Sequence, residues 1–414
     1  MKNSLLIALF SFIIVVAISA CNQENNTAKG KPFDYTLQMS IDKLVYKWAR
    51  DKQSDSLFQK VFIEAVVAKK QSNRAFIDLF SDAWIKQNSN YSLAHIYNST
   101  NGFSSIKPES NTEDVIVVLK TKINQEVKQL MHVLGSRVEE FGLRNIRFEK
   151  LIGDRISVYG DGLKSPKRLA KILTTPANVG YWPTYGFFER PIYKAVIQAD
   201  DTLRKYYKVF AKDSIEQFQG LFNYLIPNFK QNENGAFYPG QGPLLGLAKI
   251  EDTAKVNAML CFPFVKKLFP EDIVFMWGAK PFNYFKTKKG KQLNSLELFM
   301  IRAENNKDIA PISNKNMADV ELDYANNGQA ELYVTMNKES VQLWQTMTGN
   351  NLGKSIAIVI DNRVYAIPMV QCEISEGKSI ITGNLSEEEM SDFRVMIKGG
   401  SLNIPMKIIS DSTK

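Results

Sequence analysis

Apolar residues recur at helical spacing along the first quarter of the chain. In residues 57–66 and 76–84 the apolar side chains return every three or four positions, as they do on one face of an amphipathic helix. Residues 98–111 are rich in Ser, Asn and Gly, a composition typical of a loop. We therefore predict that residues 35–98 are helical and that residues 35–111 form a helical N-terminal segment.

Short apolar runs alternate with helical stretches in residues 112–190. The pattern predicts strands at residues 115–119 (VIVVL), 146–151, 155–159 and 179–182, and helices at residues 123–141 and 165–173. Gly142 follows the first of these helices, at a position where glycine commonly ends a helix. Strand, helix, two strands, helix and strand is the order of a ferredoxin-like domain. The chain is therefore predicted to be an α+β protein in which residues 112–190 supply the first part of a ferredoxin-like unit.

The pattern of apolar residues changes twice in the middle of the chain. Residues 191–242 are rich in aromatic side chains and have helical spacing up to about residue 229, which predicts a helical insertion. Residues 243–318 mix both patterns and are predicted to be an α+β segment that joins the units on either side. Its predicted strands are residues 244–250, 273–277 and 296–303, with a helical stretch between the first two.

The last unit, residues 319–414, contains a very apolar hairpin. Residues 356–360 and 364–367 are apolar, and Asp361-Asn362 between them suits a tight turn that requires positive φ. We expect this hairpin to be mostly core, with any binding surface at its exposed edge or in a cleft beneath it. The other predicted elements are strands at residues 331–336, 379–382 and 402–409 and helices at residues 337–348 and 387–398, the last with a capping box at Ser386 and Glu389.

The charge pattern gives no sign of a nucleic-acid partner. The net charge is +9 over 414 residues, and the basic residues are scattered rather than gathered on one segment. The one dense basic cluster is KTKKGK at residues 286–291. We interpret it as a solvated loop, with an anionic lipid surface as the alternative.

The N-terminus has the composition of a lipoprotein signal. Lys2 precedes an apolar stretch, residues 5–20, and Ile18-Ser19-Ala20-Cys21 resembles a bacterial lipobox. We predict a signal peptide at residues 1–20, lipidation of Cys21 and a polar tether at residues 21–34, with an uncleaved anchor as the alternative. No later segment reaches the roughly 18 apolar residues of a spanning helix. The chain is therefore expected in the bacterial cell envelope, exported, lipid-anchored and facing the periplasm.

No set of residues carries a recognisable catalytic chemistry. His95 and His132 are the only histidines, and neither has a Cys or carboxylate at ligand spacing. The stretch GNNLGKS, residues 349–355, has three residues between its glycines where a phosphate-binding loop needs four, and it follows a helix rather than a strand. We predict no catalytic, cofactor or metal site and no enzymatic activity. Whether Cys261 and Cys372 form a disulfide stays open.

The last unit resembles the head of the first periplasmic region of the SecD/SecDF protein-export family. The similar stretches are TGNNLGKSIAIVIDNRVYAIP, ISEGKSIITGNLSEEEM and IKGGSLNIP. The positions that match the family pattern are Gly353, Asp361, Val364, Pro368, Gly377, Gly383, Gly400 and Leu402. Asn362 replaces the usual turn glycine, and Asn403 replaces the usual proline.

The resemblance extends to the base of the same periplasmic region. SRVEEFGLRNIRFEKLIGDRISVYGDGLKSPKRLAKIL, residues 136–173, is similar to it, with Arg137 and Gly142 on family positions. The resemblance implies a base at residues 112–190 and a SecD-type head at residues 319–414, with the N-terminal and central helices as additions. It also implies a structural or partner-binding role for the matched residues.

In the family, the head is thought to engage the emerging polypeptide. The resemblance therefore implies a non-enzymatic protein that binds exported polypeptide, SecDF or the SecY translocon and assists translocation or folding. SecD carries charged membrane helices and an Asp-Leu-x-Gly-Gly motif, and KPFDYTLQMS stands where that motif would be, so no proton coupling is expected. The alternative is a scaffold reused for ligand binding or envelope assembly, with residues 206–229 and the YPGQGP loop (residues 238–243) lining a cleft.

Overall fold

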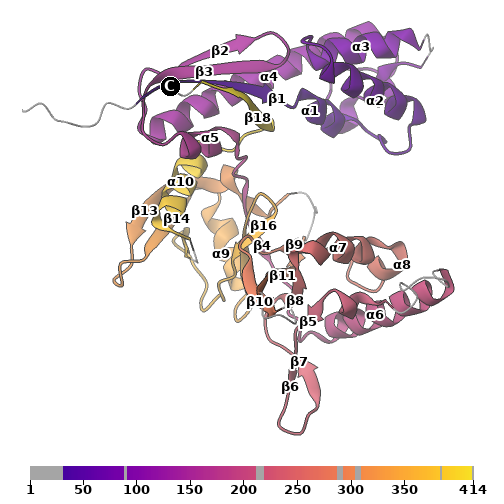
Figure 1. Ribbon diagram of the computed structural model, residues 1–414, viewed down its shortest axis with the longest axis vertical. Coiled ribbons are helices and arrows are strands. Elements are labelled where there is room, and N and C mark those ends of the chain that lie inside the picture. The colour runs from indigo at the N-terminus through magenta and orange to yellow at the C-terminus, as the bar shows by residue number, and fades with distance from the viewer. Residues whose placement is uncertain are drawn as a thin grey trace, which may run out of the picture.

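The protein mixes helices and sheets in an elongated arrangement (Figure 1). The computed structural model describes residues 31–87, 91–210, 219–286, 292–303, 309–382 and 385–412. The predicted signal peptide and Cys21 therefore lie outside the described residues, as does most of the KTKKGK cluster. The two ends of the described chain meet in one sheet at one end of the molecule, and residues 190–302 form the other end.

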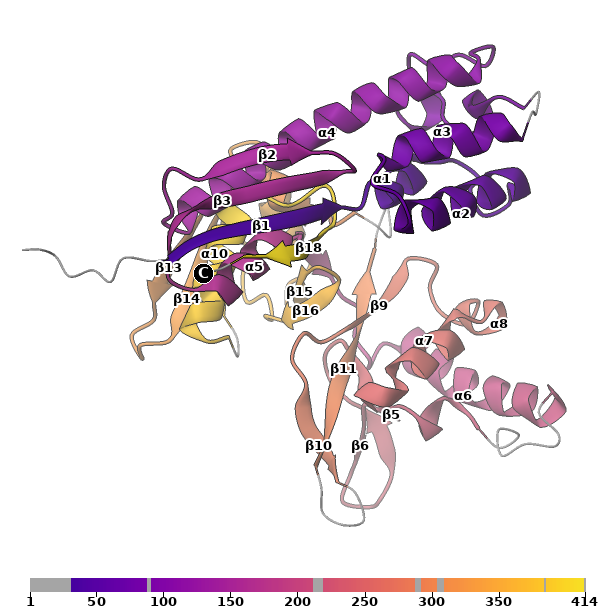
Figure 2. The ribbon, with the colours of Figure 1, turned by 45° about the horizontal axis from the view of Figure 1, so that its top comes forward.

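The sheet at the chain ends, here called the terminal sheet, has four antiparallel strands in the order β18-β1-β3-β2. Its strands are β1 (Lys31–Met39), β2 (Arg147–Leu151), β3 (Arg155–Leu163) and β18 (Met406–Asp411). The long helix α4 (Thr112–Glu140) and the shorter α5 (Pro166–Thr174) share a buried apolar core with it. Figure 2 shows α4 running behind the strands and on toward the N-terminal helices.

Strand β1 corrects the prediction that the helical segment begins at residue 35 and the tether ends at residue 34. Side chains at every second position from Phe33 to Met39 are buried, so the segment has the period of a strand. Tyr35 lies opposite Val158 of β3 on one side and Asp411 of β18 on the other. The pairing therefore joins residues that are more than three hundred positions apart.

The prediction of a strand at residues 115–119 was also wrong, because this run belongs to α4. Asn111 caps the helix by accepting a hydrogen bond from the Asp114 N–H at 2.8 Å. Val115, Leu119 and Ile123 are buried at four-residue spacing, so helical burial overrides the strand propensity of the β-branched side chains. The predicted helix end is confirmed: α4 stops one residue before Phe141, and Gly142 follows with φ +91°.

Three helices form the N-terminal segment, in agreement with the predicted spacing. They are α1 (Ile41–Trp48), α2 (Ser56–Lys70) and α3 (Phe76–Lys86). Phe58 on α2 packs on the ring of Phe80 on α3 at a centroid distance of 6.0 Å. Short 3₁₀ turns occur here and elsewhere in the chain, at Leu93–His95, Ser99–Asn101, Leu221–Asn223, Ile250–Asp252 and Asn314–Asn316.

The predicted hairpin forms one half of a second sheet, the hairpin sheet, with the order β12-β4-β15-β16. Its strands are β4 (Val179–Pro183), β12 (Ile312–Ser313), β15 (Ile356–Ile360) and β16 (Arg363–Ala366). All five residues of β15 are buried, and the turn residues Asp361 and Asn362 have φ values of +50° and +62°. The predicted turn chemistry is thus confirmed. In contrast, β4 was expected in the same sheet as β2 and β3, and that expectation was wrong.

A third sheet, β13-β14-β17, and two helices complete the last unit. The elements are β13 (Met317–Tyr324), β14 (Ala330–Met336), β17 (Lys378–Ile381), α9 (Val341–Gly349) and α10 (Glu387–Lys398). The capping box of α10 is confirmed, since the Ser386 hydroxyl accepts a hydrogen bond from the Glu389 N–H. The strand predicted at residues 402–409 is β18, which starts later and joins the terminal sheet rather than the last unit.

The insertion contains one long helix and a sheet in the order β10-β11-β8-β5, with β9 also paired to β11. The elements are α6 (Arg190–Phe210), β5 (Ile226–Pro227), β6 (Phe229–Gln231), β7 (Phe237–Pro239), β8 (Leu244–Lys249), α7 (Thr253–Cys261), α8 (Pro263–Lys266), β9 (Ile273–Trp277), β10 (Phe282–Lys286) and β11 (Gln292–Arg302). The helical prediction for residues 191–229 holds for α6 but was wrong for residues 221–229, where a 3₁₀ turn and short strands lie, and residues 211–218 lie outside the described residues. The β6–β7 hairpin projects away from the molecule (Figure 1).

Candidate functional site

Arg137, one of the family-pattern residues, is completely buried on α4. Its guanidinium donates four hydrogen bonds of 2.6 to 2.8 Å, to the backbone carbonyls of Gly400, Ile172, Thr175 and Pro176. Burial lowers the pKa of Arg137 to about 10, opposed by the nearby Asp361 charge, so the group stays cationic at neutral pH. The contacts join α4 to the end of α5 and to the segment after α10.

Asp361, at the hairpin turn, binds the backbone of the segment that precedes β4. Its carboxylate accepts hydrogen bonds from the backbone N–H groups of Ala177, at 3.0 Å, and Asn178, at 2.9 Å. The turn of the hairpin is thereby fixed to the start of β4. Asp361 and Arg137 are therefore brought together around one segment, and both form hydrogen bonds to its backbone.

The matched glycines occupy backbone conformations that other residues rarely adopt. Gly353, Gly377 and Gly400 have φ values of +71°, +66° and +100°. A Cβ atom on Gly377 would also lie 2.7 Å from the Val341 side chain. Gly383 lies outside the described residues.

Three further matched residues lie in or beside the hairpin. Val364 is only 5% exposed and belongs to a small apolar cluster, and the Pro368 carbonyl accepts a hydrogen bond from the Ile356 N–H at 3.1 Å. Asn362 is exposed at the hairpin turn. Of the residues singled out in the sequence, Asn362 and Cys261 line a large cleft.

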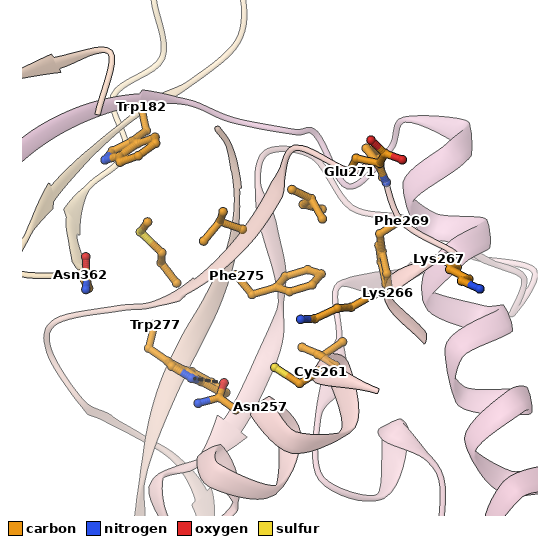
Figure 3. Close-up of a pocket in the computed structure, with 15 residues that line it drawn as sticks. Trp182, Asn257, Cys261, Lys266, Lys267, Phe269, Glu271, Phe275, Trp277 and Asn362 are labelled. Atoms are coloured by element: carbon orange, nitrogen blue, oxygen red, sulfur yellow. Dashed lines mark hydrogen bonds between the residues drawn. The ribbon is translucent and has the colours of Figure 1, made fainter. Parts of the chain in front are cut away.

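This cleft has a volume of about 1060 Å³ and lies where the insertion faces the hairpin sheet. Trp182 of β4 and Asn362 form one side, and residues of α7, α8 and β9 form the rest (Figure 3). The full lining is Trp182, Asn257, Leu260, Cys261, Lys266, Lys267, Phe269, Pro270, Glu271, Ile273, Val274, Phe275, Met276, Trp277 and Asn362.

The lining of the cleft is mainly apolar, and it includes the polar side chains of Asn257, Lys266, Lys267, Glu271 and Asn362. The Trp277 indole N–H donates to the Asn257 side-chain oxygen at 2.9 Å, which fixes the orientation of the ring. Figure 3 shows the Lys266 side chain extending beside Phe275, whereas Lys267 points away. Such a surface suits an apolar ligand with polar atoms at its ends.

No sequence motif marks this cleft, because its residues come from three distant segments. The strands at residues 179–182 and 273–277, the helical stretch before the second strand and the turn at Asn362 were each predicted, but nothing in them indicated that they would meet around a cleft. The residues that the alternative interpretation placed together in one cleft lie in different places. Tyr206 packs on Phe262 and Phe264, whereas Gln241 and Pro243 of the YPGQGP loop line another groove.

The remaining candidate residues have ordinary surroundings. His95 stacks on Tyr91 at 4.7 Å, and His132 is exposed on α4. Cys261 and Cys372 are both exposed free thiols. Among the residues with described positions, no three His, Cys, Asp or Glu side chains gather in a way that could hold a metal ion. Within the same part of the chain, no helix is long and apolar enough to cross a membrane.

Comparison with known proteins places similar sequences in one family. Residues 303–404 match the SecDF P1 head subdomain. The SecD translocase subunit of Rhodothermus marinus is 26% identical over 390 residues, which cover 91% of this chain and 60% of that protein. The chain thus spans about 60% of the length of this relative. SecDF of Thermus thermophilus is 31% identical over 115 residues, 27% of this chain and 15% of that protein.

Solved structures of SecDF also match. The structure described as that of a membrane component SecDF that enhances protein export has a TM-score of 0.38 and 18% identity, covering 69% of this chain and 92% of that one. The predicted resemblance to the first periplasmic region of the SecD/SecDF family is confirmed by the sequence matches: residues 303–404 are similar to the SecDF P1 head subdomain, and the chain is similar to SecD over most of its length.

Proposed function

We propose that this protein is a non-enzymatic component of protein export that binds exported polypeptide in an extended conformation. The observation that carries the proposal is the cleft of about 1060 Å³ beside the head hairpin, with a mainly apolar lining that includes several polar side chains. The relatives are protein translocase subunits, which supports a role in the same process.

The chemistry of the cleft suits a chain that has to be released again. Burying one Leu or Phe side chain contributes roughly 1.5–3 kcal/mol, and ordering a flexible polypeptide offsets much of it. Apolar walls accept many side chains of similar size, because dispersion contacts carry little directional information. Binding in this cleft is therefore expected to be weak and tolerant of sequence.

The terminal sheet supports an assignment as the ferredoxin-like base. Its elements follow the chain in the order strand, helix, two strands, helix and strand, as β1, α4, β2, β3, α5 and β18. Arg137 and the matched glycines would then be structural residues of the base and head. A lipid on Cys21 would hold this end of the molecule in the bacterial envelope, because β1 begins ten residues after it.

We further propose that the partner at the membrane is SecDF or the SecY translocon, and that the chain acts there without proton coupling. A photoreactive residue in place of Lys266, at the cleft, is expected to crosslink to exported precursors or Sec components in intact cells. The same residue in place of the exposed Lys43 on α1 is the control. Crosslinks from Lys266 that are confined to outer-membrane components would instead support a scaffold reused for envelope assembly.

The two exposed thiols allow a direct test of polypeptide binding. Cys261 lines the cleft, whereas Cys372 is exposed elsewhere on the surface. With Cys21 and Cys372 replaced by serine, an environment-sensitive dye on Cys261 should change its emission when an unfolded exported precursor is added.

The control carries the dye on Cys372, with Cys21 and Cys261 replaced by serine. Its emission should stay constant, because no cleft wall surrounds that position. A precursor that leaves the Cys261 signal unchanged, or alters both signals equally, would contradict binding in the cleft.

A further inference from the structure

A groove separate from the large cleft follows the outer side of the head hairpin. It has two parts of about 370 and 360 Å³, and both are lined by Glu297, Val364 and Tyr365. One part continues along residues 278–282, where the chain passes from β9 to β10. The other continues along Leu244 and the preceding loop. The two parts therefore meet at Glu297 and at strand β16.

Glu297 stands where an apolar row on β11 would be expected to continue. Alternate residues of a strand share a face, so Glu297 lies on the same face as Phe299 and Ile301. Phe299 and Ile301 are buried against Val364 and its neighbours in the small apolar cluster. Glu297 is half-buried at the end of this row, and burial raises the pKa of its carboxyl group.

The carboxylate of Glu297 has no hydrogen-bond or ion-pair partner among the residues whose positions the structure describes. The basic side chain that also lines the groove, Lys280, is engaged elsewhere, because its ammonium contacts the Glu389 carboxylate at 3.1 Å. Tyr365 packs edge-on against Phe393 at 5.1 Å. Among the side chains that the structure describes, this half-buried carboxylate therefore faces the groove without a compensating cation.

We propose that the Glu297 carboxylate binds the cationic head of a lysine or arginine side chain in an extended polypeptide lying along this groove. This inference rests on the proposed function and adds a preference to it: exported segments with a basic residue among apolar ones bind best. The apolar stem of the basic side chain lies on Val364 and Phe299, and its head reaches the carboxylate. A cation at this position restores the interactions that burial removes from the carboxylate.

A polypeptide side chain fits this groove better than a metal ion does. A single carboxylate is a poor site for a divalent cation, which takes several oxygen ligands. The groove also runs along β16, and an extended segment that lies beside a strand can place alternate side chains against it. The cation should therefore be carried by a chain rather than arrive alone.

The test compares two labelled peptides of about ten residues that are identical except at one central position. One carries lysine there and the other norleucine, which has the apolar stem without the charge. Their binding to the full chain is measured by fluorescence anisotropy. We expect the lysine peptide to bind about tenfold more tightly, as for a hydrogen bond to a charged group.

The variant Glu297→Gln keeps the shape of the side chain and removes its charge. It should weaken binding of the lysine peptide about tenfold and change binding of the norleucine peptide by less than about twofold. This is the pattern that a double-mutant cycle gives for two groups in contact. The control Glu149→Gln makes the same charge change on the exposed side of β2 and should alter neither peptide. Thermal unfolding of both variants shows that they are folded.

The outcomes separate this inference from the proposed function. Equal binding of both peptides, unchanged by Glu297→Gln, overturns the basic preference while the cleft dye on Cys261 can still report polypeptide binding. If Glu149→Gln also changes the binding of both peptides, the effect is due to net charge, and the proposed preference for a basic residue is again overturned. If neither peptide nor any precursor binds, both proposals fail together.

Discussion

Arg137 and Asp361 both form hydrogen bonds to the backbone of the same four-residue segment, residues 175–178. Arg137 donates to the carbonyls of Thr175 and Pro176, and Asp361 accepts from the N–H groups of the next two residues. This segment carries the chain from α5 of the terminal sheet into β4 of the hairpin sheet. The position of the head hairpin relative to α4 is therefore fixed by two charged side chains and the backbone between them.

Replacing Arg137 with methionine should destabilise the protein strongly. The variant leaves four carbonyls without their buried donor, and loss of one partner in a buried charged network typically costs roughly 3–5 kcal/mol. Urea unfolding measures the change. The control Arg144→Met removes an exposed cation paired with Glu139 and should cost below about 1 kcal/mol. Equal effects of the two substitutions would show that the buried contacts contribute little.

Replacing Asp361 with asparagine should cost about 1–2 kcal/mol in the same measurement, because one of its two charge-assisted hydrogen bonds to the backbone is lost and the other is weakened. Asparagine is suitable because it tolerates the φ of +50° at this turn position. Asp161→Asn on the exposed end of β3 is the matched control. A loss of stability below the control's would indicate that the turn is held by other contacts.

Much of the head follows from local sequence patterns. The hairpin, its Asp361-Asn362 turn and the capping box at Ser386 each depend on residues that lie within a few positions of one another. Such features are visible in a sequence because turn and cap chemistry is local. The match of residues 303–404 to the SecDF P1 head subdomain covers the same part of the chain.

The terminal sheet and the cleft depend on contacts that no local pattern records. Tyr35 pairs with Asp411 across nearly the full chain, so neither β1 nor β18 could be assigned to its sheet from nearby residues. The run at residues 115–119 has strand propensity, but burial along α4 makes it helical. Trp182 and Asn362 meet the insertion only in the folded chain, so the cleft had no signal in the sequence.

Two glycine substitutions near Arg137 should have opposite effects. A Cβ on Gly399 would lie 2.6, 2.8 and 2.9 Å from the Cγ, Cα and N atoms of Arg137, which prevents the close approach of α10 to α4. Gly399→Ala should therefore destabilise by roughly 1–3 kcal/mol. Gly135, inside α4, has no atom within 4 Å of its would-be Cβ, and Gly135→Ala should stabilise by roughly 0.5–1 kcal/mol. Urea unfolding of the two variants measures the sign of each change in the free energy of unfolding. A stabilising effect of Gly399→Ala would contradict the close packing of Gly399 against Arg137.

Glu297 should make stability fall as the pH rises through its titration. Burial raises the pKa of Glu297 in the folded state, so between the ordinary and the raised pKa the folded protein binds more protons than the unfolded chain. The charged carboxylate therefore destabilises the protein at neutral pH, where the facing Tyr365 is neutral and Lys280 is paired with Glu389. Glu297→Gln should raise the melting temperature at neutral pH, and the difference should vanish toward about pH 3, below the ordinary pKa of glutamate.

Glu389→Gln is the matched control, and its pH dependence has the opposite sign. Burial opposes ionisation of Glu389, but the hydrogen bonds from Ser386 and Lys280 outweigh it and lower the pKa. The folded protein then binds fewer protons than the unfolded chain, so the charged form stabilises above the ordinary pKa and this contribution is lost as the pH falls through the lowered one. Glu389→Gln should therefore lower the melting temperature at neutral pH. Shifts of the same sign in both variants would show that net charge, rather than the surroundings of each carboxylate, sets the response.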